Sequence, residues 1–185
     1  MPGAGAHRAA RSTMVIFLCA WAAVVIAIAI LGARLGRLPD LIPVYRTFLG
    51  TPTRLAQKGP ISVLRVPLMG AAQLAAVSIL AAEAWRSPVA GWLRFWTGLA
   101  VAIALKTALE ATVFAGLGTP WGATCSPALN AATIAVVVIF LSWMAILWKR
   151  GNMSGKPPIS KKSGLPVLLL LGAYIALATW PLWRS

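Results

Sequence analysis

Lys106 and Glu110 are the residues whose types and spacing could do chemistry inside a membrane. They lie four residues apart near the middle of a long apolar run, and on an α-helix this spacing places both on one face, about one turn apart. Ionisable side chains at that depth are costly, so they usually point into a bundle and pair with one another. The spacing therefore predicts an internal ion pair, either a structural clamp or part of a proton or ion path.

Few other polar side chains are available to extend such a path. Gln73 lies in the preceding apolar run, and Asn130 and Thr133 lie in the following one. Gln73 and Glu110 are predicted to lie about 10 Å from the same membrane face, which favours a hydrogen bond between them. A transporter is expected to show more polar residues on adjacent spans, or a broken helix. We therefore expect Gln73, Lys106 and Glu110 to form a small intramembrane polar cluster.

Catalytic and metal-binding patterns do not occur in the sequence. The only histidine is His7, and the two cysteines, Cys19 and Cys125, lie in no C-x-x-C pair. The only acids are Asp40, Glu83 and Glu110. No Ser/His/Asp, phosphate-loop or H-E-x-x-H arrangement is present. We therefore predict a non-enzymatic protein with no catalytic residues, no metal and no cofactor.

Long apolar runs must position these polar side chains. Of the 185 residues, 59% are hydrophobic and 11% are charged, whereas soluble domains have about 25% charged residues. Five runs are close to the ~20 residues that cross ~30 Å of hydrocarbon. They cover about residues 14–32, 66–85, 95–117, 128–148 and 165–183. The sequence therefore predicts an all-α polytopic bundle of about five spans, forming one transmembrane domain at 14–185 after a basic tail at 1–13.

A proline- and arginine-rich loop separates the first two runs. Residues 33–65 hold six basic side chains and four prolines, and prolines this dense exclude a long helix. We expect an ordered or semi-ordered loop with a short helix around residues 43–49. It is either a lipid-facing structural loop or a recognition surface for a partner. The residues expected to contact lipid or a partner are Tyr45, Arg46, Arg54 and Lys58.

The spacing of prolines, glycine and lysine in this loop forms a motif. It reads Leu38-Pro39-Asp40-Leu41-Ile42-Pro43-Val44-Tyr45, then Gly50-Thr51-Pro52, then Lys58, with Pro67 near the start of the next span. Over about residues 14–70 the chain resembles the N-terminal domain of unknown function of the SdpI-like bacterial multi-pass membrane family. Its pattern is L-P-x-x-I-P-x-H, a G-x-P turn, a lysine and an entering proline.

The resemblance implies a bacterial membrane location and a role in immunity or peptide sensing. The named family member protects its producer against a secreted toxic peptide and takes part in signalling. Tyr45 stands where the family usually has histidine, so a role that needs an imidazole does not carry over to this chain.

Basic residues set the expected orientation and partners. The net charge of +14 comes from Lys and Arg residues, mostly between the apolar runs. Such residues set topology and contact anionic lipids, and no soluble stretch is long enough for a nucleic-acid-binding domain. With a cytoplasmic N-terminus, nine basic residues lie inside and seven outside, a small bias that favours this orientation.

These features favour a protein of the bacterial cytoplasmic membrane that works by binding. We expect an accessory or assembly subunit of a larger respiratory or photosynthetic complex, with other membrane subunits and anionic lipids as partners and no nucleic acid. Two alternatives remain open. One is an SdpI-like immunity or peptide-sensing protein, and the other is a small transporter that uses Lys106 and Glu110.

Overall fold

The computed structural model describes residues 4–46, 52–85, 90–151 and 160–179. Five of its helices are long and apolar enough to cross a membrane by length and composition. The elements are α1 (Ala4–Arg34), η1 (Leu35–Arg37), β1 (Leu41–Arg46), β2 (Pro52–Gln57), α2 (Pro60–Trp85), α3 (Ala90–Ala115), α4 (Pro120–Lys149) and α5 (Lys161–Thr179). The predicted all-α architecture with five spans is confirmed.

The helices differ from the predicted spans mainly at their N-terminal ends. α1 begins at Ala4, so most of the predicted basic tail is helical, as its alanine content favours. α2 begins at Pro60 instead of residue 66. Proline is common at the first position of a helix, where its missing N–H costs nothing. Pro67, expected in the first turn of its span, therefore lies inside α2.

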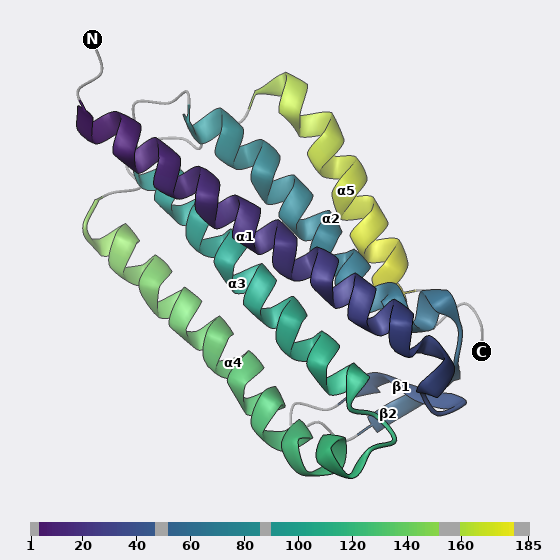
Figure 1. Cartoon of the computed structure of the whole chain (residues 1–185). Helices are drawn as coiled ribbons and strands as arrows, with labels where there is room; N and C mark the ends of the chain where they lie inside the picture. The colour runs from purple at the N-terminus through teal and green to yellow at the C-terminus, as the bar shows by residue number, and fades with distance from the viewer. Residues whose placement is uncertain (1–3, 47–51, 86–89, 152–159, 180–185) are drawn as a thin grey trace.

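The bundle is arranged around the pair α2 and α3. α1 packs across both of these helices, while α4 packs on α3 and α5 packs on α2. Figure 1 shows α1 in front of this pair, with α4 and α5 on the two outer sides. Only 6% of the apolar stretch of α4, and 6% of that of α5, is buried inside the bundle, compared with 39% for α3.

Close helix contacts fix this arrangement. A Cβ atom added at Gly70 on α2 would overlap the Thr107 side chain on α3, and one added at Gly98 on α3 would overlap the Trp143 ring on α4. Glycine therefore lets the helices approach closely at both crossings. At the end of the bundle opposite the hairpin, Ser160 donates a hydrogen bond from its hydroxyl to Glu83 Oε1, 3.0 Å away, which ties the start of α5 to α2.

The predicted loop contains an antiparallel hairpin. Ile42 in β1 pairs with Ala56 in β2, and Pro43 pairs with Leu55, with irregular register after Pro43. The expected short helix around residues 43–49 is therefore wrong for residues 43–46, and residues 47–49 lie outside the described part. Prolines are tolerated here because both strands of a two-stranded hairpin are edge strands.

A hydrophobic core attaches the hairpin to the helices. Ile42 is fully buried, whereas its neighbour Leu41 is 55% exposed. Ile42 and Leu38 pack in one buried cluster with residues of α1, α2 and α3, among them Leu31 and Phe114. The hairpin is thus part of the folded bundle.

A candidate binding site within the bundle

A cavity of about 460 Å³ lies between α2, α3, α4 and α5. Half of its lining residues are polar or charged, and they come from all four helices. These residues are Arg65 and Gln73 on α2, Lys106, Thr107 and Glu110 on α3, Asn130 and Thr133 on α4, and Tyr174 on α5. Gln73, Lys106 and Glu110, which are predicted to form a polar cluster, therefore line one cavity. Arg65, Thr107 and Tyr174, which the sequence does not connect with this cluster, line the same cavity.

Lys106 and Glu110 form the ion pair that their spacing predicts. Lys106 Nζ lies 2.9 Å from Glu110 Oε1 and 3.1 Å from Oε2. The two side chains are 39% and 31% exposed, because they border the cavity. In the described part of the chain no hydrogen bond joins Gln73 to Glu110, so the expected contact between them is not formed.

Arg65 adds a second cation to the lining. It is the sixth residue of α2 and is only 6% exposed. The sequence places Arg65 in the loop, because the second apolar run begins at residue 66. The signal that could have placed it in the helix is Pro60 directly after Gly59, since proline is favoured at the first position of a helix.

Neutral hydrogen-bonding groups complete the polar part of the lining. Thr107 is 3% exposed and lies against Gly70 on α2. On α4, Thr133 donates its hydroxyl hydrogen to Leu129 O, 3.0 Å away in its own helix. The Nδ2 of Asn130 is buried and has no hydrogen-bond partner among the described residues. A buried donor without an acceptor is unfavourable, so this amide needs a further partner.

Two of the lining helices contain an internal proline near the cavity. Pro67 in α2 follows Arg65 by two residues, and Pro127 in α4 precedes Asn130 by three. Proline has no N–H for the carbonyl four residues earlier, so it weakens the helix locally. Both helices nevertheless continue through their prolines without a break.

The hairpin contributes to the same cavity. Pro43 of β1 is buried and lines it together with the α2 residues Arg65 and Val66. The proline-rich loop and the intramembrane polar cluster are predicted from the sequence as two separate sites. In the structure both border the same cavity. Pro43 therefore borders the cavity near the start of α2.

The four loop residues that are predicted to contact lipid or a partner differ in how far the structure leaves them available. Lys58 is 24% exposed and binds within the chain, 3.2 Å from Asp40 Oδ1 and 2.9 Å from Leu38 O. Arg54 lies on β2 and is partly exposed, so it stays available to a lipid or partner. Tyr45 and Arg46 have their backbones in β1, but their side chains lie outside the described part.

The structure gives the motif residues roles in folding. Leu38 and Ile42 are buried in the core, Lys58 holds the base of the hairpin, and Pro67 is fully buried in α2. The spacing of the motif is therefore explained by the way the hairpin attaches to the bundle.

No protein-family model, curated protein or solved structure matches the chain. The resemblance to the SdpI-like family therefore stays a prediction. Within the described residues, no three His, Cys, Asp or Glu side chains form a group that could hold a metal ion. The cavity instead offers two cations, one carboxylate and several neutral hydrogen-bonding groups.

Proposed function

We propose that the chain is a non-catalytic multi-pass protein of the bacterial cytoplasmic membrane, and that it binds a ligand in the cavity beneath the hairpin. The observation that carries this proposal is the convergence of polar side chains from four helices on one cavity. Sites for small ligands are concave, and a few polar groups on their walls orient the ligand.

A purely structural clamp accounts for only part of this lining. Lys106 and Glu110 satisfy one another, so a clamp needs no further polar group nearby. Arg65, Asn130 and Tyr174 nevertheless line the same space from three other helices. Polar residues inside a membrane are costly and usually functional, and their convergence supports a binding site.

A cavity-filling substitution tests the proposal. Thr133→Phe places a large ring in the cavity, whereas Val138→Phe adds the same ring at a position on α4 that is 55% exposed and does not line it. We expect native mass spectrometry of the mildly solubilised protein to detect a bound small molecule in the wild type and in Val138→Phe. Loss of that mass only in Thr133→Phe supports the proposal, and equal occupancy in all three contradicts it.

Most of the apolar surface of α4 and α5 is not covered by other helices of the chain. This supports a second candidate function, that of an accessory subunit of a larger membrane complex. Each of these helices packs mainly on one neighbour, so helices of other subunits have room beside them. Arg46→Ala with Arg54→Ala should then reduce recovery of a stoichiometric partner, whereas substitutions of Lys156, Lys161 and Lys162 should have a smaller effect. Unchanged recovery in both sets would contradict this candidate.

Two alternative functions of the cavity, immunity and transport, predict different phenotypes. If it serves SdpI-like immunity, deletion of the gene removes resistance to a toxic peptide. If it serves transport through Lys106 and Glu110, reconstituted vesicles show solute flux that Glu110→Gln abolishes.

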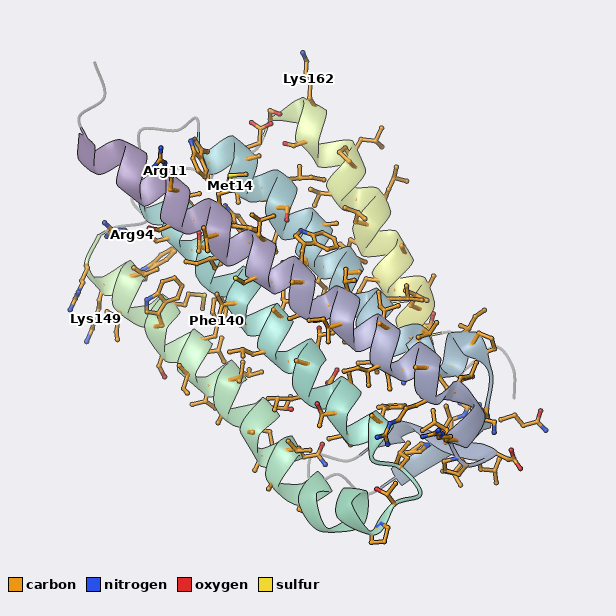
Figure 2. All side chains as sticks on the ribbon, viewed as in Figure 1. Arg11, Met14, Arg94, Phe140, Lys149 and Lys162 are labelled. Atoms are coloured by element: carbon orange, nitrogen blue, oxygen red, sulfur yellow. The ribbon has the colours of Figure 1, made fainter. Side chains whose placement is uncertain are left out.

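The charge distribution supports a cytoplasmic N-terminus. Arg11, Arg94 and Lys149 lie together at the end of the bundle opposite the hairpin (Figure 2). Arg65, counted on the hairpin side from the sequence, is buried in α2. It still lies at the hairpin end of α2, so the count of nine basic residues against seven is unchanged and gives a small excess at the N-terminal end, which the positive-inside rule assigns to the cytoplasm.

A further inference from the structure

The lining of the cavity carries a net positive charge. Arg65 and Lys106 are cations, and Glu110 is the only carboxylate among the lining residues. The chain has just two other acids. Asp40 has a side chain that is 97% exposed, and Glu83 lies near the far end of α2. Because charges interact strongly where water is scarce, this lining attracts a ligand with negative charge.

Hydrogen-bond donors in the lining favour an oxyanion over other anions. The buried Nδ2 of Asn130 has no acceptor among the described residues, and the lining also holds ammonium, guanidinium and hydroxyl groups. Carboxylate and phosphate oxygens accept several such bonds at once, and bonds from charged donors are the strong ones.

The other half of the lining is apolar. Val66, Met69, Val113, Phe114 and Ile134 face the same space as the charged groups. A small hydrated inorganic ion would leave these surfaces without a partner, whereas an apolar chain attached to the anion would cover them. The lining thus matches an amphiphile in both of its parts.

We propose that the ligand is an amphiphilic oxyanion, with one carboxylate or phosphate group on an apolar body. The charged group lies between Arg65 and Lys106, and the apolar body lies against Val113 and Phe114. Glu110 holds Lys106 in place and competes with the ligand for its ammonium group. This inference rests on the proposed function of the cavity as a ligand site.

Matched amphiphiles test the inference with the purified full chain in a non-ionic detergent. The probes are decanoate and decyl phosphate, with decanol and decyltrimethylammonium as neutral and cationic controls of equal chain length. We expect isothermal titration calorimetry to show saturable binding of both anions and no comparable binding of the controls. Equal binding of the alcohol or the cation would overturn the inference.

Charge substitutions in the lining have opposite expected effects. Arg65→Gln should weaken decanoate binding about tenfold or more, as loss of one partner in a desolvated charge pair does. Glu110→Gln should strengthen it, because the competing carboxylate is gone, and unfolding cannot imitate stronger binding. Lys162→Gln, at the start of α5 far from the hairpin (Figure 2), should leave it unchanged. If Arg65→Gln does not fold, Glu110→Gln decides alone, and unchanged or weaker binding per folded molecule contradicts the inference.

An experiment in nanodiscs distinguishes a lipid ligand from a soluble anionic ligand. Decanoate binding is compared in phosphatidylcholine nanodiscs with and without phosphatidylglycerol. Competition by phosphatidylglycerol assigns the site to a lipid head group, and unchanged binding assigns it to a soluble amphiphile. Both outcomes support an anion site.

The same probes distinguish this inference from the proposed function. If a neutral or cationic probe binds and Thr133→Phe abolishes that binding, the cavity is a ligand site but its ligand is not an anion. If no probe binds and native mass spectrometry shows equal occupancy in Thr133→Phe, the proposed function fails as well.

Discussion

Lys58 donates a hydrogen bond from its ammonium group to the carbonyl oxygen of Leu38, 2.9 Å away at the base of the hairpin. Its backbone N–H bonds to Asp40 O at 2.7 Å. Leu38 itself is buried in the core between the helices. Lys58 therefore joins the end of β2 to the chain that enters β1, the strand that contains Pro43.

Removal of this closure should loosen the hairpin. Lys58→Met should lower the free energy of unfolding by about 1–2 kcal/mol, because a hydrogen bond from a charged group to a carbonyl is lost. Asp40→Asn should have almost no effect, since Asp40 is 97% exposed and exposed ion pairs contribute little. Denaturation in mixed micelles measures both, and equal losses would contradict this role of Lys58.

The crossing of α2 and α3 should not tolerate a methyl group at Gly70. Gly70→Ala overlaps the Thr107 side chain and should cost about 1–3 kcal/mol of stability, as overpacking does. Adding Thr107→Ala should recover part of the loss. Gly172→Ala is the control, because nothing lies within 4 Å of a Cβ added there. If Gly70→Ala is as stable as Gly172→Ala, the close approach of α2 and α3 is wrong.

The Lys106–Glu110 pair should be energetically coupled. Glu110→Gln should lower stability, because it leaves Lys106 without its carboxylate. Lys106→Met combined with Glu110→Leu should recover part of this loss, with a coupling energy on the order of 1 kcal/mol. A double-mutant cycle on thermal unfolding measures the coupling, and strictly additive losses would argue against the pair.

The topology can be checked by cysteine labelling in intact cells, after Cys19 and Cys125 are replaced by serine. The N-terminal parts of α1 and α5, which contain Ser12 and Lys162, lie at one end of the bundle, and the hairpin, in which β2 ends at Gln57, lies at the other (Figure 1). We expect an impermeant reagent to label Gln57→Cys from outside, and Ser12→Cys and Lys162→Cys only after lysis. Labelling of all three from one side would contradict a five-span fold, and the inverse pattern would reverse the orientation.

The five spans could be predicted from the sequence, because their apolar runs are long and well separated. The hairpin could not, since Pro43 and Pro52 argue against strands in general. They are tolerated here only because a two-stranded ribbon has no central strand. The buried side chain of Ile42 shows why the segment is ordered, because it packs in one cluster with residues of α1, α2 and α3.

Only part of the cavity lining could be predicted from the sequence. Lys106 and Glu110 could be paired from their spacing within one helix, because that geometry is local. Arg65, Asn130 and Tyr174 lie on three different helices, and their convergence depends on how each helix is rotated about its axis. In apolar runs without a clear polar face, a single sequence does not determine that rotation.

The central claim is that the polar residues of four helices form one positively charged site in the cavity that Pro43 of the hairpin borders. Reactivity of Thr133→Cys with small thiosulfonate reagents, in a chain without Cys19 and Cys125, tests this most directly, with Val138→Cys as the lipid-facing control on the same helix. We predict that Thr133→Cys reacts from the hairpin side, faster with a sulfonate-bearing reagent than with a trimethylammonium-bearing one, while Val138→Cys stays unreactive. Equal inertness of the two positions, or faster reaction with the cation at Thr133→Cys, would contradict the account.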